Sequence, residues 1–160
     1  MNRRAVLAGL TATIAAAPLS LTAGAGRAFA QGGQRFSRIV VDMQPLIARG
    51  GSGAAAIIRP QLQASLQREF SGRIGRGGPA LTVRVHTVLL SGSVVPGGRR
   101  GGGTSSDYLE AEVIAGTQRF PLLVTQDALS AGGAWYLPDN EPRRLRALAD
   151  SLAAWVARRV

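Results

Sequence analysis

The sequence predicts an α+β fold, a two-layer sandwich in which a four-stranded mixed sheet carries two helices on one face. Three observations support this prediction. Apolar residues recur at helical spacing in two stretches, they alternate with polar residues in two others, and the elements follow in the order β-α-β-β-β-α. Each helix has one apolar face, and packing both faces against one side of a sheet buries them most economically.

The first half of the domain is predicted to be a strand, a helix and a strand. Residues 38–43 are rich in β-branched side chains, and residues 81–86 alternate between apolar and polar. Between them, residues 54–70 place apolar side chains four apart, at Ile58, Leu62, Leu66 and Phe70. Pro60 indicates that this helix either starts near Arg59 or bends there. A crossover helix of this kind joins parallel neighbouring strands.

The second half is predicted to contain two more strands and a helix. Residues 108–114 alternate, and residues 119–126 form the next strand, which Pro121 places toward a sheet edge. A tight turn at Gly116-Thr117 makes these strands antiparallel. The last helix can be capped by Asp139 or Asn140, with Pro142 in its first turn. Its predicted apolar face consists of Leu145, Leu148, Leu152, Trp155 and Val156.

The first 30 residues have the features of an export signal. Arg3 and Arg4 precede an uncharged, weakly apolar stretch, and Ala28-Phe29-Ala30 forms an A-x-A cleavage site. The paired arginines make this segment resemble a twin-arginine signal, which a receptor recognises. We therefore expect cleavage after Ala30, export to the periplasm, and a single domain over residues 31–160. No transmembrane segment is expected after cleavage, and no cysteine is present to accept a lipid.

The charge of the expected mature chain is strongly basic. All 19 basic residues of the full sequence are arginine, and residues 31–160 contain 16 of them against nine acids. Arginine binds carboxylate and phosphate groups with a planar fork of donors. A basic periplasmic domain could therefore contact an envelope protein or an anionic lipid or glycan, whereas export removes it from nucleic acid.

Two segments and one helix end carry the residues predicted to bind such a partner. The Gly/Arg-rich loop 91–106 is longer than an ordinary hairpin connection, so it is either a binding loop or a disordered insert. Arg99 and Arg100 near its tip are the predicted anion contacts. Trp135 either fixes the entry to the last helix or forms part of a partner surface. Arg143 and Arg144 lie in the first turns of that helix, where the dipole disfavours positive charge, which indicates an interaction surface.

Two further features bear on catalytic chemistry. Residues 51–56 match the G-x-G-x-x-A form of a dinucleotide loop but lack its tight strand-to-helix turn and its acidic residue on a following strand. A loop with Ser52 or Gly53 as helix cap is the better interpretation. His86 is the single histidine and falls on the polar side of its strand. No cysteine nucleophile or G-x-S-x-G elbow accompanies it. We therefore predict no catalytic residue, metal or cofactor.

Paired acids on one strand are a third candidate for catalytic groups. Glu110 and Glu112 lie two residues apart, and cross-strand pairing with Arg84 and Arg119 is the preferred role for them.

The order of the predicted elements resembles small domains of Gram-negative envelope assembly and transport-auxiliary proteins. This resemblance spans about the whole of residues 31–160 and implies a non-catalytic periplasmic binding or assembly-accessory domain. The alternative is a small periplasmic hydrolase or cofactor-dependent enzyme built around His86, Asp42 and the loop at 51–56.

Overall fold

The computed structural model describes residues 34–91, 106–131 and 137–160. The predicted signal at residues 1–30 lies outside the described residues, as do Arg99, Arg100 and Trp135. The predictions made for these positions therefore stay predictions.

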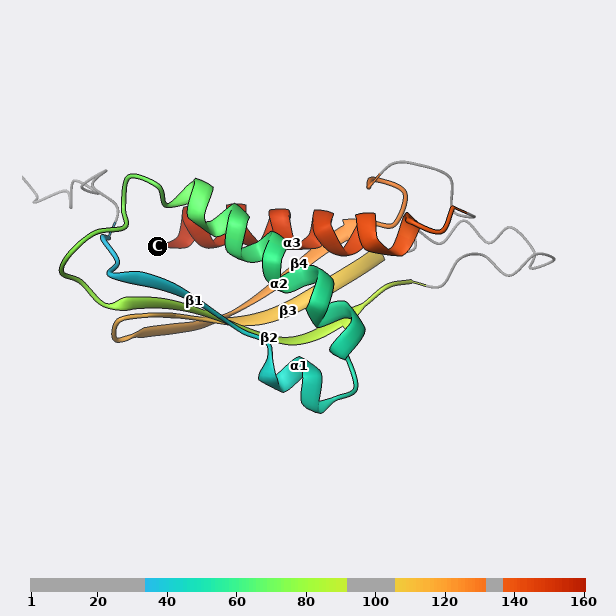
Figure 1. The fold of residues 1–160 in the computed structure, drawn as a ribbon, viewed down its shortest axis with the longest axis horizontal. Helices are drawn as coiled ribbons and strands as arrows, with labels where there is room; N and C mark the ends of the chain where they lie inside the picture. The colour runs from blue at the N-terminus through green and yellow to red at the C-terminus, as the bar shows by residue number, and fades with distance from the viewer. Residues whose placement is uncertain (1–33, 92–105, 132–136) are drawn as a thin grey trace, which may run out of the picture. The chain divides into compact units, whose positions relative to one another are not determined.

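Four strands form one mixed sheet in the order of the sequence (Figure 1). They are β1 (Arg38–Asp42), β2 (Ala80–Leu89), β3 (Ser106–Ala115) and β4 (Gln118–Asp127). β1 runs parallel to β2, and the other neighbours are antiparallel. The predicted mixed sheet is thus confirmed. Gly116, with a φ of 65°, makes the tight turn between β3 and β4, and Pro121 lies on an edge strand as expected.

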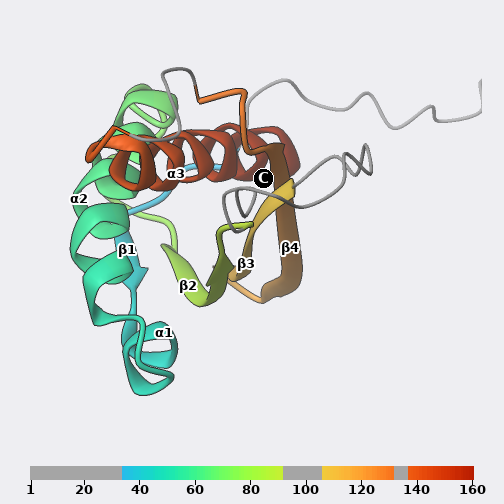
Figure 2. The same cartoon turned by 90° about the vertical axis from the view of Figure 1, so that its right-hand side faces the viewer.

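Two long helices pack side by side on one face of this sheet (Figure 2). They are α2 (Ser52–Glu69) and α3 (Asn140–Arg159), and they correspond to the two predicted helices. A third helix, α1 (Gln44–Ala48), was not predicted. It has five residues with Pro45 in its first turn, and it packs beside β2. The two-layer α+β architecture is therefore confirmed, with one short helix added.

Pro60 does not mark the start of α2, because eight residues of this helix precede it. Because proline has no backbone N–H, the hydrogen bond from residue 60 to the carbonyl of the preceding turn is missing. Ile58 and Leu62, on either side of Pro60, are both fully buried. Their burial in the core holds the helix together across the missing bond, so the prediction of a start near Arg59 is wrong.

The core lies between the helices and the inner face of the sheet. Alternate residues of the strands face inward, and one stripe of each helix meets them. The buried stripe of α3 includes Leu145, Leu148, Leu152 and Val156. Trp155 was predicted to belong to this stripe, but its side chain is 44% exposed. Ala149 and Ala153 complete the stripe on its other flank, which leaves Trp155 outside it.

The outer face of the sheet carries a row of alternating charges across all four strands. Arg84 on β2 binds Asp42 on β1 at 2.9 Å and Glu112 on β3 at 3.4 Å. Glu112 also pairs with Arg119 on β4 at 3.5 Å. The predicted pairing with both arginines is confirmed for Glu112, whereas Glu110 forms no ion pair with any described residue. The row fixes the register of the strands on the face that the helices leave uncovered.

Candidate binding groove

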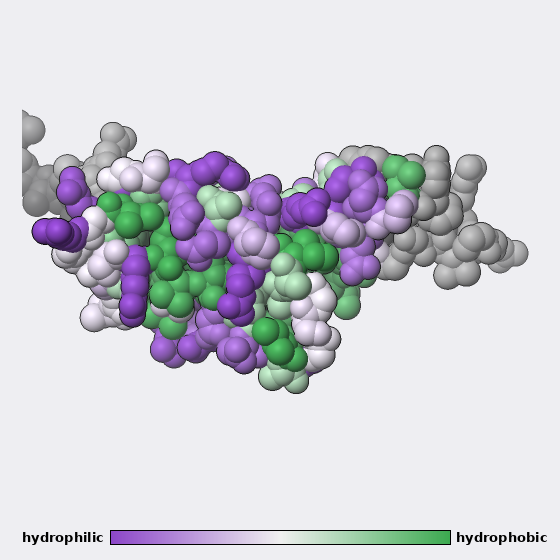
Figure 3. Space-filling model, in the orientation of Figure 1, coloured by the Kyte–Doolittle hydropathy of each residue, from purple (hydrophilic) through white to green (hydrophobic). Residues whose placement is uncertain are grey.

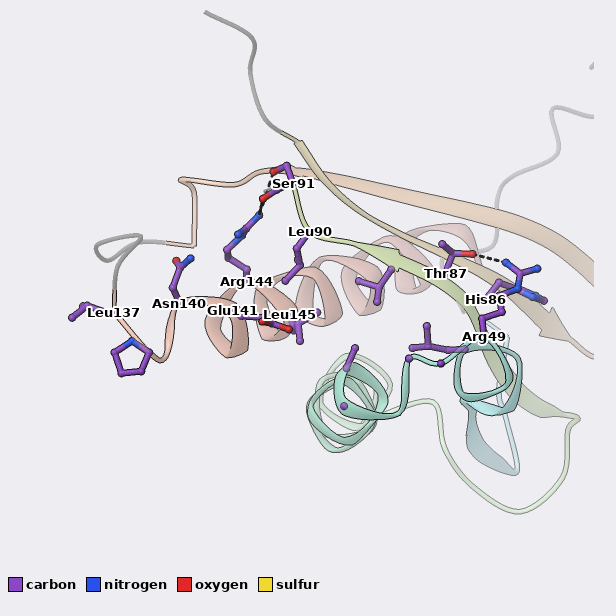
Figure 4. A pocket seen from close by; sticks show the side chains of 17 residues that line it. Arg49, His86, Thr87, Leu90, Ser91, Leu137, Asn140, Glu141, Arg144 and Leu145 are labelled. Carbon is purple, nitrogen blue, oxygen red and sulfur yellow. Dashed lines mark hydrogen bonds between the residues drawn. The ribbon is translucent and has the colours of Figure 1, made fainter. Parts of the chain in front are cut away.

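A groove of about 850 Å³ opens at the end of the domain where α2 and α3 begin (Figure 4). Its walls come from the α1–α2 corner, the last part of β2 and the first turns of α3. Arg49, His86, Thr87, Glu141 and Arg144 contribute polar groups, and apolar side chains separate them. The groove therefore offers both hydrogen-bonding and apolar contacts to a ligand.

One wall of the groove is an unpaired edge of the sheet. Pairing of β1 with β2 ends at Arg84, although β2 continues to Leu89. From His86 onward, the edge of β2 that faces away from β3 has no strand partner among the described residues. His86, Thr87, Val88, Leu90 and Ser91 line the groove along this edge. The backbone groups of this edge that α1, packed beside β2, leaves free can pair with another extended chain.

A bulge at His86 reorients this part of β2. The register with β3 shifts between Val85 and Thr87, so β2 contains one extra residue relative to β3 at this point. Inward-facing residues are odd-numbered before the bulge, ending at Val85, and the partly buried apolar residues after it are Val88 and Leu90. This change of parity is visible in the sequence and was the available signal for the bulge.

The α1–α2 corner brings the first turn of α2 to the groove. Gly50 has a φ of 87°, and Gly51 packs so closely on Leu46 that a Cβ there would lie 2.6 Å from a methyl carbon of Leu46. Gly51 is the N-cap of α2, so the prediction that Ser52 or Gly53 caps this helix is wrong. A Cβ at Gly53 would meet no atom within 4 Å, which makes this position an open part of the groove lining.

Arg49, at the end of α1, extends to the edge of β2 beside the groove. Its Nη1 donates a hydrogen bond to Thr87 Oγ1 at 2.8 Å (Figure 4). Among the described residues, no carboxylate forms an ion pair with Arg49. Its guanidinium therefore keeps donors for an acceptor that enters the groove.

A buried ion pair closes the inner end of the groove. Arg144 on α3 is 6% exposed and Asp107 on β3 is 2% exposed. Arg144 Nε donates to Asp107 Oδ2 at 2.7 Å, its Nη2 donates to Asp107 Oδ1, and the same Nη2 donates to the Ser91 carbonyl at 2.8 Å. Ser91 in turn donates its N–H and its hydroxyl to Asp107, each at 2.9 Å.

The same contacts set the charge states of the pair. Burial by itself would raise the pKa of Asp107, but the hydrogen bonds from Arg144 and Ser91 outweigh it and hold this pKa below its ordinary value. The hydrogen bond to Asp107 raises the pKa of Arg144 despite burial. Both groups are therefore charged at neutral pH, and they tie α3 to the two strand ends that flank residues 92–105.

The residues predicted to bind a partner differ in their exposure and in their contacts. Arg143 is half-buried and pairs with Asp139 at 3.4 Å. Arg144 was expected on an exposed surface, and that expectation is wrong because Asp107 draws it into the buried ion pair. The segments that carry Arg99, Arg100 and Trp135 are not described, but Ser91 before the first and Leu137 after the second both line the groove.

His86 lies in the groove, but the acid proposed to work with it does not pair with it. Asp42 accepts the N–H of Gln44 at 2.9 Å and the guanidinium of Arg84 at 2.9 Å. These two hydrogen bonds lower the pKa of Asp42. Within the described residues, no group of three or more metal-ligating side chains comes together. The groove presents both polar and apolar side chains, so it suits the binding of a segment that carries both kinds of side chain.

An open-faced α+β domain with a groove at one end is the class of protein that these observations define. The chain is similar to a minor lipoprotein from Acinetobacter baumannii, known from a crystal structure, with 10% sequence identity and a TM-score of 0.39. The likeness covers 79% of this chain and 92% of the lipoprotein. No protein-family model matches the chain, and a search of curated proteins finds no match. Across the described ranges of the chain, no helix is long and apolar enough to span a membrane.

Proposed function

We propose that this chain is a non-catalytic accessory domain of the cell envelope that holds an extended segment of a partner protein in the groove. The signal-like features of residues 1–30 support a periplasmic site of action reached by the twin-arginine route. The observation that carries the proposal is the unpaired edge of β2 from His86 to Leu89, which lines the groove together with the two residues that follow it, Leu90 and Ser91.

An extended peptide is the ligand that such an edge fits best. A strand added to an open sheet edge gains main-chain hydrogen bonds, and pockets beside it select its side chains. The four edge residues of β2, from His86 to Leu89, correspond to a length of about 13 Å, at roughly 3.3 Å per residue. Leu90 and Leu145 offer apolar contacts, and Arg49 offers donors to an acidic side chain. The bound segment is therefore expected to be extended, with alternating apolar and acidic residues.

Photo-crosslinking in living cells tests this proposal directly. A photoreactive amino acid placed at Thr87 lies at the edge of β2 that lines the groove, whereas one placed at Thr125 lies on β4, at the opposite edge of the sheet and outside the groove. We expect Thr87 to crosslink to one envelope protein within a short segment of it, and Thr125 to give no such product. Crosslinks of equal pattern from both positions, or products that contain glycan or lipid in place of protein, would contradict the proposal.

A blocked groove provides the matched functional control. Gly53→Trp fills an open position in the groove, and Gly72→Trp adds the same side chain at an equally open position outside it. The Thr87 crosslink should disappear in the first variant and persist in the second. Persistence in both would show that the partner does not occupy the groove.

The enzyme alternative centres on His86 and makes a different prediction. The groove-lining position of His86 is the observation that favours it. His86→Gln keeps a hydrogen-bonding side chain of similar reach but cannot act as a general base near neutral pH. If the chain only binds a partner, this variant keeps the Thr87 crosslink and still complements cells that lack the protein. Loss of complementation with the crosslink intact would favour the enzyme.

A further inference from the structure

Three segments far apart in the sequence meet at the end of the domain opposite the groove (Figure 1). They are the start of β1, the turn after α2 and the last turn of α3. Phe36 forms a bridge with Ile74, and its N–H donates to the Arg73 carbonyl at 2.8 Å. Arg73 then donates from Nε to the Gln34 carbonyl at 3.2 Å and from Nη1 to the Ala157 carbonyl at 3.5 Å.

Arg73 is the hub that holds these segments together. Its guanidinium lies 4.6 Å from the centre of the Phe70 ring and 5.9 Å from that of Phe36. Burial lowers the pKa of Arg73, as expected for a cation packed among rings. Because Arg73 makes its contacts within the domain, it holds the three segments in place and does not itself bind a ligand in this proposal.

The surface that Arg73 organises is strongly basic. Five exposed arginines lie on the three segments, and we call them the basic end: Arg35, Arg38, Arg76, Arg158 and Arg159. None of them forms an ion pair with a described carboxylate. The acidic side chains nearest to them in the sequence are Asp42, four positions after Arg38 and already paired with Arg84, and Glu69, in the last turn of α2. Elsewhere in the described chain, Arg68, Arg84, Arg119, Arg143 and Arg144 are paired with acids, whereas Arg49, Arg59 and Arg146 are not.

Exposed apolar side chains accompany these charges. Ile74 lies in the turn beside Arg73 and is 38% exposed. Trp155, near the end of α3, has the guanidinium of Arg158 5.0 Å from its ring centre. In Figure 3 the same end, at the left of the view, shows purple hydrophilic side chains around a green apolar area. Basic side chains beside tryptophan and aliphatic side chains occur on protein surfaces that lie at a membrane interface.

From this combination we infer that the basic end docks on an anionic phospholipid bilayer. An array of unpaired arginines on one end matches a surface of many phosphates, and the apolar side chains among them can enter the headgroup region. A small soluble anion would need only one or two of these arginines. Docking through this end leaves the groove, at the opposite end, directed away from the bilayer.

Vesicle binding of the protein, purified as cells produce it, tests the inference. The probes are vesicles of phosphatidylcholine mixed with phosphatidylglycerol, and vesicles of phosphatidylcholine alone. The test variant is Arg158→Gln/Arg159→Gln. The matched control is Arg59→Gln/Arg146→Gln, which removes two exposed arginines that have no acidic partner among the described residues and lie on the middle of α2 and the start of α3. Each basic residue near an anionic surface strengthens binding by about a factor of five, so the loss of two should weaken binding of the test variant by about 25-fold.

Fluorescence of Trp155, measured in the Trp135→Phe background, provides a second readout. Its emission should shift to shorter wavelength, and quenching by acrylamide should fall, when mixed vesicles are added. The control variant should bind mixed vesicles within a few-fold of the original protein. Equal losses in the two double variants would overturn the inference, because they would show only a generic basic surface. So would an unchanged Trp155 emission, or full displacement of the protein from mixed vesicles by millimolar inorganic phosphate at constant ionic strength.

Discussion

The buried pair of Arg144 and Asp107 allows a quantitative test of how α3 is fixed to the sheet. Arg144→Met keeps a long apolar stem but removes both charge-assisted hydrogen bonds to Asp107. Asp107 would then remain buried with only the N–H and the hydroxyl of Ser91 as donors. Removing one partner of a buried pair costs about 3–5 kcal/mol, because it leaves an uncompensated charge.

The structure favours the lower part of this range. The two remaining hydrogen bonds from Ser91, each 2.9 Å, still satisfy one carboxylate oxygen of Asp107. We therefore expect the free energy of unfolding to fall by about 3 kcal/mol. For a domain of this size, the corresponding fall in Tm is roughly 10 °C.

Thermal and urea unfolding, followed by circular dichroism, measure this change. The set comprises the original protein, Arg144→Met, Asp107→Asn and the double variant. Since the two groups interact directly, the double variant should lose less stability than the sum of the single variants, by about 1–3 kcal/mol. A loss below about 1 kcal/mol for Arg144→Met, or strictly additive losses, would refute the stabilising role of this ion pair.

The pH dependence of the same variants has a definite sign. The pKa of Asp107 is lower in the folded protein than in the unfolded chain, where it is near 3.9. Its contribution to stability is therefore complete at neutral pH and is lost as the pH falls below about 4 and through the folded pKa. The difference in Tm between the original protein and Arg144→Met should shrink over that acidic range.

Three further predictions concern the base of the long loop, the α1–α2 corner and the N-terminal segment. Deletion of residues 95–103 should change Tm little, because the buried ion pair already joins the two ends of this loop; a fall of many degrees would mean that the loop packs on the domain. Gly51→Ala should destabilise the protein by about 1–3 kcal/mol through overpacking, whereas Gly53→Ala, with open space around it, should be neutral or slightly stabilising, and urea midpoints that fall equally would contradict this. Replacement of both Arg3 and Arg4 by Lys should leave precursor in the cytoplasm, as judged by mass spectrometry of cell fractions; normal maturation would instead indicate the general secretory route.

The order of the main elements could be predicted from the sequence because each has a strong local pattern. The four-residue spacing of Ile58, Leu62 and Leu66 and the turn at Gly116 act over a few residues, and the structure confirms both. α1 was missed because a helix of five residues has only one buried side chain, Leu46, and cannot show a period.

The groove was harder to predict because it depends on contacts between distant residues. Arg144 looks like a surface residue in its helix, since Asp107, its partner, lies 37 positions away. Arg49 and Thr87 were not singled out, because their hydrogen bond joins residues 38 positions apart. The shift of apolar residues from odd to even positions after His86 was the one local signal of the altered strand edge.

Pro121 has a consequence for the other open edge of the sheet. The two-residue turn makes Ala115 and Gln118 a hydrogen-bonded pair, and pairs alternate from there along the hairpin, so the nitrogen of Pro121 is directed away from β3. A strand from another molecule that approached β4 would find no donor at that point, in the middle of the stretch it needs. Pro121 therefore interrupts the edge-to-edge pairing that turns sheets into fibrils, which matters most if the chain waits, already folded, for export.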